Sequence, residues 1–180
     1  MESLVGKFLL AGPALLDPNF VRTVVLVIRH DDDGAFGLVI NRPTKISIAD
    51  AMGAEMDAAA TVGDPIYFGG PCQGPVFILH TESSVGGDEA VPGVFTTTDR
   101  EAIESLLQTQ SEPLKIFASY SGWGAGQLEN ELEEGGWLIC EASLEEVFAV
   151  DPNHWSRLFT RINISRFVSP DRIPDDPSVN

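Results

Sequence analysis

A glycine-rich loop between an expected strand and an expected helix is the part of this sequence best suited to bind an anion. It runs from Gly122 through Gly124 to Gln127, between residues 114–120 and 127–134. Backbone N–H groups at the start of a helix can hold a phosphate. However, Gln127 stands where a dinucleotide fingerprint has its third glycine, and no Gly-Lys-Ser/Thr follows as in a phosphate loop. Glu129 would also repel a phosphate, so we favour a tight turn plugged by Trp123.

The serines and cysteines do not form a catalytic pattern in the sequence. Ser119 and Ser121 lie near the loop, but neither stands in a Gly-x-Ser-x-Gly motif, and no histidine is close to them in the chain. Cys72 has no basic neighbour in the sequence to activate its thiol. No catalytic residue is therefore assigned, and whether the protein is an enzyme is left open.

A metal site has equally little support. The three histidines are His30, His80 and His154, and no two of them stand at i, i+4. Three aspartates at 31–33 follow His30, but sites with oxygen ligands space their carboxylates apart. Adjacent aspartates are more typical of a solvated hairpin tip. We therefore expect no metal and no other cofactor.

Two strand ends and a glycine turn remain as candidate ligand-binding positions. Arg22 and Arg42 lie at strand ends, where a guanidinium can reach a carboxylate or phosphate. In so acidic a chain, an internal pair with Asp or Glu is the favoured alternative. A Gly-Gly-Pro turn at 69–71 can line a pocket or simply reverse the chain. If these segments converge with the glycine-rich loop, the candidate ligand-binding residues are Arg22, Asn41, Arg42, Gly69, Gly70, Gly122, Trp123, Gly124 and Gln127.

The chain is strongly acidic. Its 180 residues include 27 acidic and 11 basic ones, which gives a formal net charge of −16. Such a surface repels phosphate backbones and anionic membranes, so we expect neither direct nucleic-acid binding nor membrane binding. Residues 129–146 hold seven glutamates and no basic residue. A solvated face is the simpler interpretation of this stretch, and a docking surface for a basic partner protein is the other.

The cysteines and the start of the chain favour the cytoplasm. Cys72 and Cys140 form no C-x-x-C motif, and two free thiols fit a reducing compartment. The first residues lack the basic and apolar regions of a secretory signal. The longest apolar run, residues 24–28, is far too short to span a membrane.

The order of the expected elements indicates an α+β fold with a mixed sheet. Residues 23–30 and 35–41 are predicted to form an antiparallel hairpin, and the first strand is apolar enough to be buried on both faces. Further strands are expected at 66–68, 76–80, 94–96, 114–120 and 137–140, with an irregular segment at 9–20 and loops at 69–71 and 83–92. Capping-box patterns predict helix starts at Ser47, Thr98 and Ser143, and helices are also expected at 127–134 and 152–162. A repeated βαβ order is missing, which argues against a doubly wound parallel sheet.

Taken in order along the chain, several segments resemble the YqgE/AlgH family of bacterial proteins. The matching segments are residues 6–13, 17–20, 22–26, 37–43, 67–71, 77–80, 121–129 and 136–138. The resemblance implies a strongly curved or barrel-like, largely antiparallel sheet with helices packed outside. The family's label as a transcriptional regulator names no catalytic residue or ligand. Cys72 and Ser121 stand where relatives typically have small apolar residues, which weakens a role for either as a nucleophile.

These observations favour a regulatory or adaptor protein that is not an enzyme, acts through protein–protein contacts, and is thereby an indirect transcriptional regulator. The alternative is a small-molecule-binding sensor or enzyme with its pocket near residues 122–127. Direct DNA regulation, suggested by the family label alone, is disfavoured by the charge. Residues 1–168 are expected to form a single domain, and the Asp- and Pro-rich residues 169–180 a disordered tail. The sequence does not indicate the oligomeric state.

Overall fold

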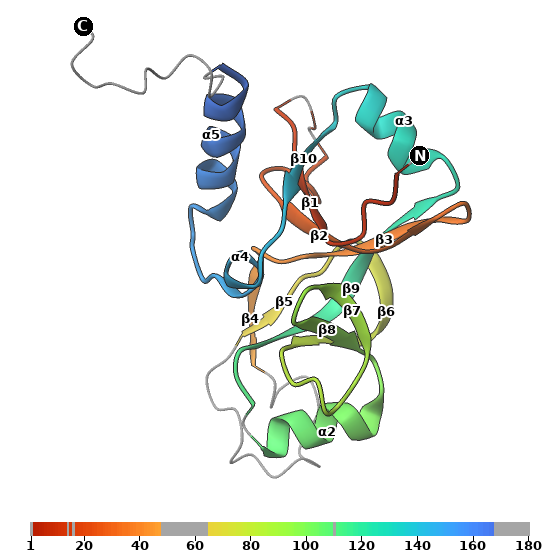
Figure 1. The fold of residues 1–180 in the computed structure, drawn as a ribbon, viewed down its shortest axis with the longest axis vertical. Coiled ribbons are helices and arrows are strands. Elements are labelled where there is room, and N and C mark those ends of the chain that lie inside the picture. The colour runs from red at the N-terminus through yellow and green to blue at the C-terminus, as the bar shows by residue number, and fades with distance from the viewer. Residues whose placement is uncertain (1, 14, 16, 48–64, 110, 168–180) are drawn as a thin grey trace, which may run out of the picture.

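Ten strands form one strongly curled sheet in this computed structural model, which describes residues 2–13, 15, 17–47, 65–109 and 111–167. The strand order is β10-β1-β2-β3-β9-β6-β8-β7, with β5 paired to β9 and β4 paired to β5 (Figure 1). The strands are β1 Lys7–Ala11, β2 Val24–Asp31, β3 Gly34–Val39, β4 Pro43–Ser47, β5 Pro65–Tyr67, β6 Cys72–His80, β7 Asp88–Val91, β8 Val94–Thr97, β9 Leu114–Gly124 and β10 Trp137–Glu141. Only the β5–β9 pair of these is parallel. The predicted α+β class with a curved, largely antiparallel sheet is therefore confirmed.

Four helices pack around this sheet in the described part of the chain. They are α2 Arg100–Gln108, α3 Gln127–Glu133, α4 Leu144–Phe148 and α5 His154–Phe167. In Figure 1, α2 lies at the far end from β10, whereas α5 stands beside β10. The Ser143 hydroxyl caps α4 by accepting from the Glu146 N–H, as predicted. The cap of α2 is Asp99 rather than the predicted Thr98, and its carboxylate accepts from the Ala102 N–H.

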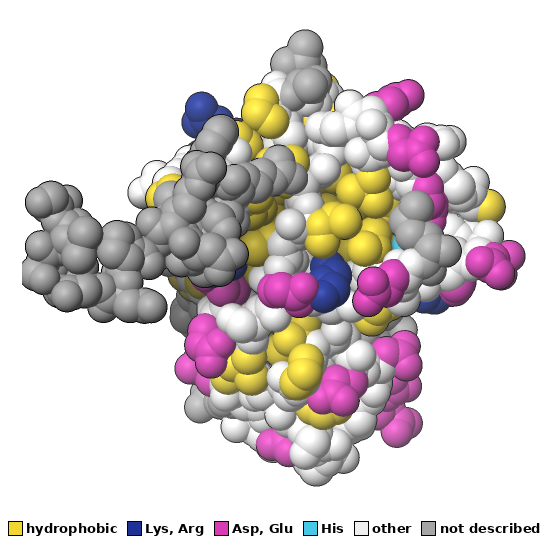
Figure 2. Space-filling view, turned by 45° about the horizontal axis from the view of Figure 1, so that its top comes forward, with side chains coloured by type: hydrophobic (Ala, Val, Ile, Leu, Met, Phe, Trp, Pro, Cys, Tyr) yellow, Lys and Arg dark blue, Asp and Glu magenta, His cyan; other side chains and the backbone are white. Residues whose placement is uncertain are grey.

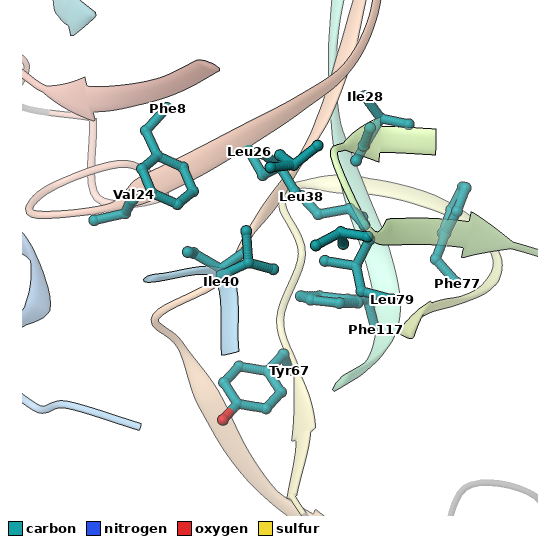
Figure 3. Packing of buried hydrophobic residues seen from close by; sticks show 14 of the residues in the cluster. Phe8, Val24, Leu26, Ile28, Leu38, Ile40, Tyr67, Phe77, Leu79 and Phe117 are labelled. Carbon is teal, nitrogen blue, oxygen red and sulfur yellow. The ribbon is translucent and has the colours of Figure 1, made fainter. Parts of the chain in front are cut away.

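The core explains why the central hairpin is apolar on both faces. Val24, Leu26 and Ile28 of β2 pack into one buried cluster, which Figure 3 shows with Leu38 and Phe117. The alternate residues of β2, Val25 and Val27, point into a second cluster on the other face. Burying each such side chain stabilises the fold by roughly 1.5–3 kcal/mol. Both faces of the hairpin therefore contribute to stability, as its sequence predicts.

Three expected features differ from the structure. Residues 9–11 belong to strand β1 rather than to an irregular segment, and residues 88–91 form strand β7 rather than a loop. The glycine-rich segment is strand through Gly124, because Gly122 pairs with Phe36 and Gly124 with Gly34. Chain reversal begins only after Gly124, before α3. The helix expected from Ser47 and the tail expected at 169–180 lie outside the described residues.

The turn between β5 and β6 lies directly against β9. A Cβ atom on Gly69 would stand 2.0 Å from the Ser119 carbonyl oxygen, and one on Gly70 would stand 2.2 Å from Ser121 Oγ. The Ser121 hydroxyl donates to the Gly69 carbonyl across 3.1 Å. These contacts need glycine, so both residues have a packing role.

A carboxylate on α4 holds α5 against the domain. Glu146 accepts hydrogen bonds from both terminal nitrogens of Arg157, each across 2.7 Å, and from Arg161 across 3.0 Å. His154 Nε2 lies 3.0 Å from the same carboxylate, and Arg157 Nε also donates to Asp151 across 2.9 Å. The bidentate bond from Arg157 is the largest cause that lowers the pKa of Glu146 to about 2. This network pairs both Arg157 and Arg161 with a carboxylate inside the chain.

Replacing Gly69 by Ala should destabilise the fold by about 2–3 kcal/mol, because the new methyl group would force the β9 backbone to move. Gly126 is the matched control. Its φ is +72°, and a Cβ there would meet nothing within 4 Å, so Gly126→Ala should cost only about 1 kcal/mol of backbone strain. Urea unfolding of the two variants measures both effects. Equal losses of stability would contradict the packing role of Gly69.

Glu146→Gln should reduce the dependence of the free energy of unfolding on pH at acid pH. The pKa of Glu146 is lowered to about 2. The ionised carboxylate therefore contributes fully to the free energy of unfolding above its ordinary pKa, and this contribution is lost as the pH falls toward 2. That contribution is up to about 3 kcal/mol. Glu104→Gln, which breaks an exposed pair with Arg100, should leave the profile nearly unchanged. The free energy of unfolding between about pH 2 and 5 measures the difference, and coincident slopes for wild type and Glu146→Gln would contradict it.

Candidate functional site

The two predicted strand-end residues Asn41 and Arg42 bind their own chain. Arg42 donates to the carbonyls of Pro18, Asn19 and Val21, across 3.2, 2.7 and 2.8 Å. The Asn41 amide accepts from the Val24 N–H and donates to the Arg22 carbonyl. These bonds fasten the segment between β1 and β2. Arg42 therefore has the favoured internal role, but its hydrogen-bond acceptors are backbone carbonyls rather than a carboxylate.

Arg22 lies at the same end of the hairpin. Its guanidinium carbon is 5.6 Å from the centre of the Trp155 ring on α5, a cation–π contact. Its φ of +55° is unusual for a residue other than glycine. The Trp155 indole in turn donates to the Ala11 carbonyl across 2.9 Å. Arg22 thus helps to seat α5 on the sheet.

The glycine-rich segment forms the end of β9 that leads into α3. Trp123 is buried, and its indole donates to Glu131 across 2.9 Å, as predicted for a plug. Trp137 donates to the same Glu131 oxygen across 2.7 Å. Gln127 accepts from the Gly124 N–H and donates to Glu131. The polar side chains of this loop therefore have partners within the chain.

The candidate residues thus form two groups. The first group holds the Arg42 strand end and the glycine turn at 69–70. They are neighbours because Phe68, just before Gly69, donates its N–H to the Arg42 carbonyl. A Cβ on Gly122 would lie 3.6 Å from Cys72 Sγ, which places that part of β9 beside the start of β6. Trp123 instead packs with Phe20 and Trp137 in the second cluster. Binding of a ligand by any of these residues stays a prediction.

The histidines occupy three separate places. His30 Nδ1 accepts from the Leu4 N–H, so its Nε2 donates to Glu129 across 2.7 Å. His80 is buried and stacks on Phe95, and burial lowers its pKa. His154 belongs to the Glu146 network, and burial is the main cause that lowers its pKa. Among the residues whose placement is described, no three His, Cys, Asp or Glu side chains gather as a metal site would need.

A hollow of about 540 Å³ lies along β10, at one end of the sheet. It is lined by Ile139, Cys140, Glu141, Ala142, Ser143, Arg161 and Ile162. The first five come from β10 and the link to α4, and the last two from α5. Ile139 is 44% exposed, so the strand carries apolar surface at this edge. Arg161 donates to Cys140 Sγ across 3.3 Å and fixes α5 beside the strand.

The pairing of β10 with β1 determines which backbone groups face this hollow. Gly12 donates its N–H to the Gly136 carbonyl, so Gly12 and Gly136 form a hydrogen-bonded pair. In an antiparallel ladder such pairs alternate, so Leu138 and Cys140 bond β1. The N–H and C=O groups of Ile139 therefore point to the open side of the strand. Within the described part of the chain, β10 has β1 as its only strand neighbour.

A second hollow, of about 260 Å³, lies beside Lys115 on β9. Its walls come from β5, β9 and the segment around the end of α4, and include Tyr67, Ile116, Phe148 and Val150. Lys115 is only 3% exposed, and its ammonium donates to the carbonyls of Ile40 and Ala149 across 3.1 and 3.0 Å. The Tyr67 ring centre lies 4.7 Å from Nζ. Burial lowers the pKa of Lys115 to about 8.

Sequence reasoning missed both hollows. The β10 edge depends on which strands are neighbours, and Cys140 and Arg161 meet only through the fold. Lys115 did leave a signal, because it is a lone cation between Leu114 and Ile116 in the otherwise apolar segment 114–118. The structure further shows, for the residues it describes, no helix with the length and apolar character needed to cross a bilayer.

Comparison with known proteins gives a consistent result. The family model described as AlgH-like matches residues 8–166. A UPF0301 protein of Chlorobaculum tepidum is 39% identical over 159 residues, which are 84% of this chain and 83% of the relative. A UPF0301 protein of Streptomyces avermitilis is 38% identical and is matched over 100% of this chain and 97% of its own length.

Two solved structures share the fold. The solution structure of the AlgH protein from Pseudomonas aeruginosa has a TM-score of 0.76 and 31% identity, covering 93% of this chain and 94% of that one. A crystal structure of a Corynebacterium diphtheriae protein has a TM-score of 0.71 at 21% identity, covering 94% and 90%, and supports the fold alone. The curled sheet, the family model and these relatives all agree: the chain belongs to the AlgH-like family of UPF0301 proteins.

Proposed function

We propose that this protein is a regulatory or adaptor protein that binds an extended segment of a partner protein along the open edge of β10. The single observation that supports this function is the outward-facing backbone of Ile139 beside a hollow of about 540 Å³. An extended segment placed there would add a strand to the sheet, and its main chain would bond the free N–H and C=O groups.

The walls of the hollow suit a peptide with apolar side chains. Ile139, Ala142 and Ile162 supply apolar contacts, and Arg161 lies across the groove on α5. In peptide-binding sites of this type, backbone bonds to the edge strand give affinity and the side-chain pockets give specificity. A strand edge with a helix beside it offers both kinds of contact.

The charge favours a basic partner. Glu133 and Glu134 are exposed just before β10, and Glu145 is exposed just after it. The net charge of −16 would steer a positively charged partner toward this protein and keep nucleic acid away. On the face drawn in Figure 2, acidic side chains outnumber Lys and Arg. A regulatory effect on transcription would therefore be indirect, through a protein rather than through DNA.

Photo-crosslinking in the living cell tests the location of the partner. A benzoylphenylalanine in place of the exposed Glu145, two residues after the groove residue Ser143, should capture a partner protein that mass spectrometry identifies. The same group in place of Glu101, on α2 at the far end of the molecule, is the control. Equal capture from both positions would contradict binding at β10.

Proline at position 139 tests the mode of binding. Because the Ile139 N–H points away from β1, Ile139→Pro removes the outward donor and spares the ladder. Ile139→Thr removes similar apolar surface and keeps the N–H. We expect Ile139→Pro to bind the identified partner at least about tenfold more weakly than Ile139→Thr does. The proline removes one hydrogen bond at the strand edge and hinders close approach of the partner's backbone. Equal affinity of the two folded variants, measured by calorimetry, would contradict strand addition.

A further inference from the structure

We propose that the hollow beside Lys115 is a binding site for a small organic monocarboxylate. This inference is independent of the β10 edge, because it rests on residues of β5, β9 and the end of α4. Its basis is a lysine with a buried ammonium group, Lys115, that lines a pocket whose other walls are mostly apolar.

The surroundings of Lys115 leave its charge without an ionic partner. Two carbonyl oxygens and the Tyr67 ring contact the ammonium group. No Asp or Glu of the described residues forms a salt bridge with it, although 27 acidic residues are present in the chain. A buried charge that lacks a counter-charge is costly, and a carboxylate ligand would remove that cost.

The size and walls of the pocket define the ligand class. A volume of about 260 Å³ is near the lower limit for small-molecule sites, which span roughly 300–1,000 Å³. Ile116 and Phe148 suit a short hydrocarbon chain. Glu112 lies at the exposed rim, and together with the acidic surface it disfavours ligands with several negative charges. These features favour a short-chain carboxylate over a phosphate ester.

The charged and titratable groups around the pocket predict its pH dependence. Tyr67 and Glu112 line it, and His154 on α5 is close enough to Lys115 for that cation to lower its pKa. Lys115 carries its charge below a pKa of about 8. Binding should therefore hold from about pH 6 to 7.5 and weaken above about pH 8, whereas the carboxylate of the ligand stays ionised throughout.

Titration with hexanoate, followed by ¹H–¹⁵N NMR, tests this site. We expect saturable shifts of the amides of Lys115, Ile116 and Phe148, and none with hexanamide, which has the same chain without the charge. Lys115→Met keeps the apolar part of the side chain and removes the ammonium group. This variant should bind hexanoate at least about tenfold more weakly than the wild-type protein does. Lys45→Met, at an exposed lysine on β4, is the matched control and should bind as wild type does.

Three results would overturn the proposal. One is the absence of saturable hexanoate binding to the wild-type protein at about pH 7. Another is hexanoate binding to folded Lys115→Met with wild-type affinity. The third is hexanamide binding as tightly as hexanoate, because a merely apolar pocket would not distinguish the two. Thermal melting of each variant establishes that it is folded.

Discussion

Backbone hydrogen bonding at the ends of an open sheet is the constraint on which this structure depends. Among the described residues each inner strand pairs with at least two neighbours, but the curled sheet does not close, so β7, β4 and β10 have one strand neighbour each and are edges. Two edges carry common protections: β7 has only four residues and contains Asp88 and Glu89, and β4 contains Pro43 and Lys45. β10 has no proline, and its one charged residue is Glu141 at its end. The hollow beside β10 therefore coincides with an edge whose charged residue, Glu141, stands only at its end.

The α4–α5 unit connects this edge to the rest of the molecule. Glu146 binds Arg157 and Arg161 on α5, and Arg161 also reaches Cys140 on β10. The Ala149 carbonyl at the end of α4 accepts from Lys115 on the other side. The segment thus lies between the two hollows and touches the polar groups of both. A ligand that moved the Lys115 contact would act on the same segment that forms one wall of the β10 groove.

Local patterns in the sequence predicted much of the fold. The central hairpin, the buried face of α2 and the Ser143 cap follow from residues close together in the chain. Strand β7 escaped prediction because Asp88 and Glu89 have low strand propensity, and only pairing with β8 keeps them extended. The glycines of β9 predict a turn when they are considered locally, because their pairing with β3 depends on tertiary structure. The β10 edge and the burial of Lys115 are likewise products of strand order, which no local pattern records.

Hydrogen exchange of individual β10 amides tests the central claim, that this edge is a binding surface, most directly. In the free protein, the outward amide of Ile139 should exchange at least about tenfold faster than the amides of Leu138 and Cys140, which bond β1. When the partner is bound, the Ile139 amide should become as slow as its neighbours. An Ile139 amide that is already protected in the free protein, or that exchanges equally fast in the complex, would contradict the account.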